Sequence, residues 1–120
     1  MWRAKKEYDK AIADYTEAIR LDPKFALAHN GFAWLLATCP VEKYRDGKKA
    51  VEFATKAVKL HDTWGYRDTL AAAYAEAGDF ELAVTEQRKA LEDKSLDKDD
   101  RKQMEAHLEL YRAKKPYRDE

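Results

Sequence analysis

Alanines recur at matched positions in three segments of this chain, and this repeat constrains the fold more than any other feature. Ala11, Ala50 and Ala83 form one set of equivalent positions. A second set follows seven residues later: Ala18, Ala57 and Ala90. Both sets have the same offsets, 39 and then 33 residues. Because a small side chain lets two helices approach closely, the matched alanines predict helices packed in the same way in each unit. The alternative is three amphipathic helices whose faces are similar by coincidence.

Helical periodicity accompanies the alanines. In the first segment the apolar positions recur every three or four residues: Tyr8, Ala11, Ile12, Tyr15, Ala18 and Ile19. A second helix type lies between the alanine-bearing segments. One example has Ala28, Phe32, Ala33, Leu35 and Leu36, and the other has Tyr66, Leu70, Ala71, Ala73 and Tyr74. Only 4 Gly and 3 Pro occur in the chain, which favours an all-α fold.

Two stretches resemble the tetratricopeptide repeat. One runs from Leu70 through the Ala77-Gly78-Asp79 turn to Leu91, and the other from Glu7 to Asp22-Pro23. The resemblance covers roughly residues 5–93. It implies a right-handed superhelical solenoid of helix–turn–helix units with about six helices. In that family, A-type helices line a concave groove and B-type helices form the convex back.

The sequence is interpreted as a single domain over 1–120. Its parts are an unpaired B-type helix at 3–21, a repeat at 24–60 with an insertion near 37–45, a repeat at 64–93, a capping helix at 97–114 and a tail at 115–120. No A-type helix precedes the first B-type helix. The chain could therefore be the C-terminal part of a longer repeat array.

Several residues mark the predicted helix ends. Pro40 should end the helix before the insertion, and Tyr44 should fold back onto the domain. Asp62 or Thr63 should cap the helix that follows them, and Asp97 should cap the last helix.

The charge balance argues against nucleic acid as a partner. Lys plus Arg and Asp plus Glu both total 23, so there is no basic excess to neutralise phosphates. No stretch has the roughly 18 apolar residues of a membrane span. The single cysteine, Cys39, cannot form an intramolecular disulfide. These features predict a cytoplasmic protein that does not bind membranes.

The sequence contains no recognisable catalytic or metal-binding motif. His29, His61 and His107 lie far apart, and none has a partner at metal-ligand spacing. Cys39 stands beside a helix-ending proline, without a recognisable base or oxyanion site. We therefore expect a non-catalytic protein with no catalytic residue, metal or cofactor.

The resemblance and the helical register together predict a groove that binds a protein or peptide. The A-helix positions that point away from the B-type helices are Leu27, Asn30, Trp34, Ala37, Asp68, Ala72, Ala75 and Glu76. Trp34 is either an exposed hot spot for the partner or a side chain packed under the insertion, with Tyr44 or Pro40 as its cover. Asp68 and Glu76 would favour a basic partner.

Two further inferences concern specificity and assembly. Some family members hold the carboxylate of a chaperone C-terminus with Lys and Arg on A-type helices, but here residues 26–38 have neither and residues 65–77 have only Arg67. That specificity is therefore not expected.

The alternative function is a structural unit that dimerises through its unpaired first helix. The residues expected at that contact are Trp2, Tyr8, Ile12, Tyr15 and Ile19.

Overall fold

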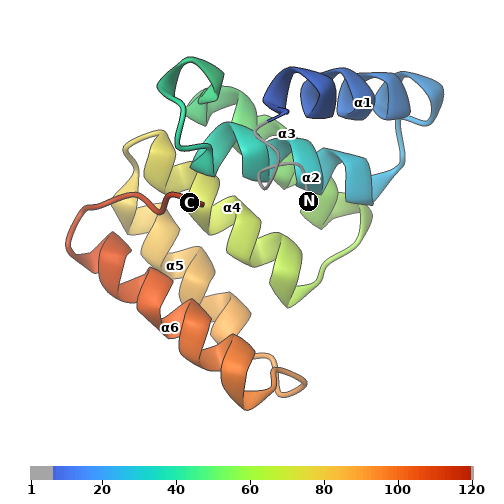
Figure 1. Ribbon diagram of the computed structural model, residues 1–120. Coiled ribbons are helices and arrows are strands. Elements are labelled where there is room, and N and C mark those ends of the chain that lie inside the picture. Colours follow the sequence, from blue (N-terminus) through green and yellow to red (C-terminus); the bar gives the residue numbers. More distant parts are fainter. Residues whose placement is uncertain (1–6, 120) are drawn as a thin grey trace.

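Six α-helices and one 3-10 helix build the fold in a computed structural model that describes residues 7–119 (Figure 1). The helices are α1 (Tyr8–Leu21), α2 (Ala26–Thr38), η2 (Glu42–Tyr44), α3 (Gly47–Leu60), α4 (Trp64–Glu76), α5 (Phe80–Leu91) and α6 (Lys98–Arg112). Residues 7–119 contain no strand. Each α-helix packs against the next one along the chain, and α4 also packs against α2. The predicted all-α helical solenoid is confirmed.

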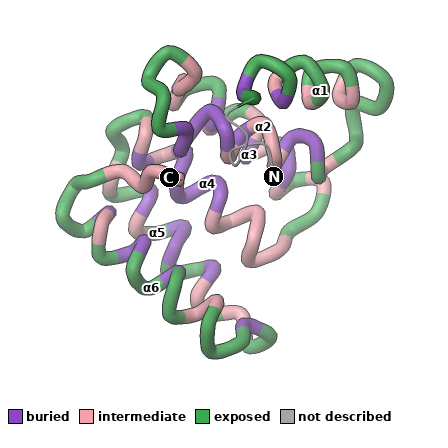
Figure 2. The backbone as a smooth tube through the Cα atoms, in the orientation of Figure 1, coloured by how far each residue is buried: buried purple, intermediate pink, exposed green. Residues whose placement is uncertain are grey.

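The repeated alanines lie where the helices meet. Ala11, Ala50 and Ala83 are each 0% exposed. In the second set, Ala57 and Ala90 are buried, whereas Ala18 on α1 is only half-buried. Figure 2 shows buried residues along α2, α4 and α5, and a larger exposed share on α1 and α6. The alanine spacing therefore reports real helix contacts.

Helix caps explain where several helices begin and end. The side chain of Asp97 accepts a hydrogen bond from the Asp100 amide at 2.7 Å, as predicted for the start of α6. Thr63, not Asp62, caps α4, accepting from the Tyr66 amide at 3.1 Å. Gly78 follows α4 with a φ of 91°, the left-handed conformation that glycine adopts without a steric penalty.

The insertion forms a loop that returns to α1. Helix α2 ends at Thr38, before Pro40, as expected. The short helix η2 then brings the ring of Tyr44 to 5.3 Å from the ring of Tyr8, between centroids. The prediction that Tyr44 folds back onto the domain is confirmed.

The C-terminal end of the described chain differs from the expected tail. Helix α6 ends at Arg112, two residues before its predicted end, and Lys114 takes a φ of 60°. The chain then turns back from the end of α6, and its end lies beside α4 (Figure 1). We call residues 116–119 the C-terminal segment. All four of its residues are half-buried, so the segment packs on the repeats.

Candidate functional site

One surface, formed by α2, α4 and α6, carries Trp34, Glu76 and His107, and we call it the inner face. Small residues bring these helices together. Ala37 and Ala72 lie in the core shared by α2, α3 and α4. Ala75 packs with Tyr111 of α6. These three alanines are at most 2% exposed, so they permit the close approach of the helices but offer almost no contact surface.

The C-terminal segment is anchored to α2 by two hydrogen bonds at Asp119. The backbone amide of Asp119 donates to the carbonyl oxygen of Thr38 at 2.8 Å. The indole Nε1–H of Trp34 donates to the Asp119 carboxylate at 3.0 Å. The first bond uses only backbone atoms, and the second requires an acceptor side chain at this position of the segment.

An ion pair joins the same segment to α4. Arg118 Nη1 lies 2.8 Å from Glu76 Oε1, and the two side chains are 26% and 17% exposed. Arg45, which follows η2, approaches the other carboxylate oxygen of Glu76 with its Nε at 3.3 Å. Glu76 thus lies between two guanidinium groups, one from the insertion loop and one from the C-terminal segment.

Aromatic rings close the site towards α6. The ring of Tyr117 lies 5.7 Å from Trp34 and 4.2 Å from His107, between centroids. The Trp34 and His107 rings are themselves 6.5 Å apart. Tilted rings at these separations attract one another in addition to burying apolar area.

Beneath this aromatic group lies a buried polar cluster. Asp68 accepts a hydrogen bond from Gln87 Nε2 at 2.9 Å and lies 3.3 Å from Nδ1 of His107. Gln87 also donates to the carbonyl of Met104 at 2.9 Å. Burial and the nearby Asp68 carboxylate raise the pKa of Tyr111 far above its ordinary value. The cluster fixes α6 against α4 and α5. The Asp68 carboxylate, predicted to face a basic partner, is paired with Gln87 and His107 of its own chain.

Trp34 is half-buried under the C-terminal segment. Neither sequence-based alternative included this cover: Tyr117 and Asp119 contact the indole, whereas Tyr44 packs on Tyr8. The indole therefore contacts the C-terminal segment of its own chain.

The other predicted positions on α2 lie nearer its start. Leu27 is 60% exposed. Asn30 is half-buried, and its Oδ1 is buried with no hydrogen-bond partner among residues 7–119. The predicted residues thus lie on α2 and α4. Of these, Trp34 and Glu76 make polar contacts with the C-terminal segment, and Ala75 belongs to the cluster on which Tyr117 packs.

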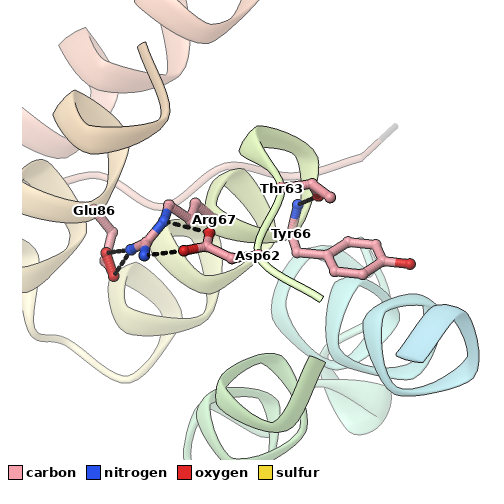
Figure 3. A network of polar contacts seen from close by, with 5 residues as sticks. All are labelled: Asp62, Thr63, Tyr66, Arg67 and Glu86. Atoms are coloured by element: carbon pink, nitrogen blue, oxygen red, sulfur yellow. Dashed lines mark hydrogen bonds and ion pairs between the residues drawn. The ribbon is translucent and has the colours of Figure 1, made fainter. Parts of the chain in front are cut away.

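Arg67, the single basic residue of α4, is held in an ion-pair network with Asp62 and Glu86 (Figure 3). It donates to Asp62 at 2.7 and 2.8 Å and to Glu86 at 3.0 and 3.1 Å. The guanidinium keeps the pKa of Asp62 below its ordinary value. Arg67 therefore ties the loop before α4 to α5.

Four of the five predicted self-association residues lie on α1. Tyr8 is 6% exposed and packs with Leu35 and Tyr44, so its ring is already covered. Three further positions are half-buried: Ile12, Tyr15 and Ile19. Trp2 lies outside the described residues. Leu21, at the end of α1, is 69% exposed, and Phe25 in the following turn is 42% exposed.

Residues 7–119 contain no group of three or more His, Cys, Asp or Glu side chains arranged to hold a metal ion. Cys39 is buried and carries no disulfide. Within the part of the chain that the structure describes, every helix is too short or too polar to cross a membrane.

Comparison with known families gives one match. A family model of the tetratricopeptide (TPR) repeat matches residues 2–35, a span that includes α1 and most of α2. No curated protein and no solved structure matches the chain. The matched residues are similar to a tetratricopeptide repeat, and the stack of six helices is consistent with a helical solenoid of that kind. Repeats of this family generally mediate contacts between proteins and are typically non-catalytic.

Sequence reasoning missed the contribution of Tyr117, Arg118 and Asp119. An aromatic, a basic and an acidic residue follow Pro116 directly, and an extended chain directs neighbouring side chains to opposite sides. An aromatic side chain among these charged residues was the one sequence feature that could have indicated packing of the tail on the domain. The surface on which it packs was not readable, because that surface is assembled from three helices.

Proposed function

We propose that this chain is a protein-interaction module that holds an extended peptide of a partner protein on its inner face. One observation carries the proposal: the inner face already holds residues 116–119 of the chain itself, which form no helix. The contacts include a backbone hydrogen bond at Thr38, an aromatic contact at Trp34 and an ion pair at Glu76.

These three contacts are those that a peptide-binding surface uses. A backbone hydrogen bond supports any sequence, and pockets or charges for particular side chains add specificity. A large aromatic residue at the centre of an interface commonly contributes much of the binding energy. Trp34 occupies such a position, with Glu76 beside it to select for a positive charge.

The test is selection of binding peptides from a random peptide library, followed by affinity measurements on variants. Because the C-terminal segment contacts the same side chains, the affinities are compared in chains that carry Asp119→Ala, which removes the segment's hydrogen bond to Trp34. There Trp34→Ala and Glu76→Gln should each weaken binding of the selected peptides, by about tenfold for Trp34→Ala, while circular dichroism shows an unchanged helix content. Leu82→Ala is the matched control, because Leu82 is 43% exposed on α5, away from the inner face. Selected peptides that bind the chain with Trp34→Ala as tightly as the chain without it would contradict the proposal.

A second function, self-assembly through the first helix, is favoured by a different observation. Leu21, Phe25 and Leu27 are 69%, 42% and 60% exposed around the turn between α1 and α2. Exposed apolar side chains close in sequence favour association. Light scattering over a dilution series should then show a dimer that Leu21→Asp weakens. A constant monomer mass at every concentration would exclude it.

A further inference from the structure

We infer that the C-terminal segment is a built-in competitor for the inner face, and that its Tyr-Arg-Asp sequence reports the chemistry of the partner. The expected partner is an extended peptide in which an aromatic residue, an arginine and an acidic residue follow one another. This inference rests on the proposed function and adds to it the class of partner and a means of regulation.

The segment presents its side chains as an extended peptide does. Tyr117 and Asp119, two positions apart, both contact Trp34 on α2. Arg118, between them, reaches Glu76 on α4. Alternation to opposite sides with a period of two is the property of extended backbone. The segment therefore spans α2 and α4 in the way that an independent peptide could.

Each side-chain contact selects a chemical class. The space between Trp34 and His107 takes a flat ring, because the Tyr117 ring lies 5.7 and 4.2 Å from them. Glu76 favours a guanidinium, which presents several donors to a carboxylate. The indole N–H of Trp34 requires an acceptor, which Asp119 provides. The backbone bond to Thr38 adds affinity without selecting a sequence.

The short connection to α6 makes the segment an effective competitor. Only residues 113–115 separate it from the end of α6. A short tether of this kind gives an effective concentration on the order of millimolar. A partner peptide must therefore displace the segment, and its apparent affinity falls in proportion to the fraction of molecules in which the inner face is open.

The test uses the full chain and a synthetic probe, the peptide Lys-Pro-Tyr-Arg-Asp-Glu blocked at both ends. Arg118→Glu should release the segment, because it places a carboxylate beside Glu76. We expect this variant to bind the probe at least about tenfold more tightly than the unmodified chain. Arg112→Glu, a charge reversal on an exposed residue of α6, is the matched control and should leave probe affinity unchanged.

Two further measurements test which side chains the inner face recognises and whether the segment and the probe occupy the same place. A probe with glutamine in place of arginine should bind Arg118→Glu at least fivefold more weakly than the original probe. The Trp34 indole N–H resonance should shift on release of the segment and shift back on addition of the probe. If Arg118→Glu impairs folding, as judged by circular dichroism, Asp119→Ala replaces it in the same assays.

Equal affinities of the unmodified chain and the variant for the probe would overturn the inference. A dimer of the unmodified chain that Arg118→Glu abolishes would also overturn it, because the occupant would then be the segment of a second copy. If the variant fails to bind the probe but binds peptides selected from a random library on the same face, the inference fails while the proposed function stands.

Discussion

The indole nitrogen of Trp34 lies 3.0 Å from the carboxylate of Asp119, although 85 positions separate the two residues in the chain. This hydrogen bond joins α2 to the end of the described chain. Together with the backbone bond from Asp119 to Thr38, it holds the end of the C-terminal segment against α2.

Replacing Asp119 with alanine removes the acceptor for this half-buried indole N–H. We expect the free energy of unfolding to fall by about 1 kcal/mol, since a hydrogen bond to a charged group contributes about 1–3 kcal/mol and the segment is partly solvated. Urea unfolding followed by circular dichroism measures the change. Glu105→Ala, at an exposed position on α6, serves as the control. A loss no larger than that of the control would show that the contact adds nothing to stability.

The Glu76–Arg118 pair should contribute more than an exposed pair at similar distance. A double-mutant cycle with Glu76→Gln and Arg118→Gln is expected to give a coupling energy of about 1 kcal/mol. The same cycle on Glu109 and Arg112, whose side chains are 69% and 46% exposed at 3.1 Å, should give about 0.3–0.5 kcal/mol. The Glu76 and Arg118 side chains are only 17% and 26% exposed, so solvent screens their interaction less. Equal couplings in the two cycles would argue against a specific role for Glu76.

Tyr111→Phe should leave the protein as stable as before, or stabilise it by up to about 1 kcal/mol. The reason is that the buried Tyr111 hydroxyl has no hydrogen-bond partner within residues 7–119. Stability should be measured by urea unfolding at pH 8. A loss above about 1.5 kcal/mol would mean that the hydroxyl has a partner that the structure does not show.

The same variant should change the alkaline limb of the stability profile. The pKa of Tyr111 is raised in the folded protein, so its phenol stays neutral while an unfolded tyrosine ionises near pH 10. The stabilising contribution is therefore complete below about pH 10 and is lost as the pH rises further. Tyr111→Phe should lose stability less steeply between pH 9.5 and 11. Parallel slopes in variant and unmodified protein would contradict this.

Two glycine-to-alanine changes should have opposite effects. A Cβ on Gly47 would lie 2.6 Å from the backbone nitrogen of Ala77, so the start of α3 would have to move away from the end of α4. We expect a loss of about 1–3 kcal/mol. Gly65, in the first turn of α4, has no neighbour closer than 3.9 Å, and its replacement should gain up to about 1 kcal/mol. Thermal unfolding measures the change in stability for both variants. An unchanged stability of Gly47→Ala would contradict the prediction, because it would show that α3 and α4 adjust to the added methyl group without cost.

The fold could be predicted from local patterns. Alanine spacing located the helix contacts, and Asp97 and Gly78 marked helix ends by their intrinsic preferences. Each of these signals depends on residues a few positions apart. The choice between Asp62 and Thr63 as the cap of α4 could not be made from the sequence, because both are capping residues. In the structure the Asp62 carboxylate pairs with Arg67, five residues later, and Thr63 caps the helix.

The candidate site was only partly predictable. Register placed Trp34 and Glu76 on the correct helices, but exposure depends on what covers them. Their cover comes from Tyr117 and Arg118, which have no helical period and acquire meaning only through contacts with distant residues. The contact between His107 and Tyr117 could not be predicted either, because it depends on how the C-terminal segment packs against α6 in space.

The most direct test of peptide binding on the inner face is amide chemical-shift mapping of the full chain carrying Arg118→Glu, titrated with a library-selected peptide. We predict that the largest shifts occur at Trp34, Thr38 and Glu76, with little change on the outer surfaces of α3 and α5. Largest shifts on α1 or on those outer surfaces, with Trp34 unaffected, would contradict the claim that the inner face binds the partner.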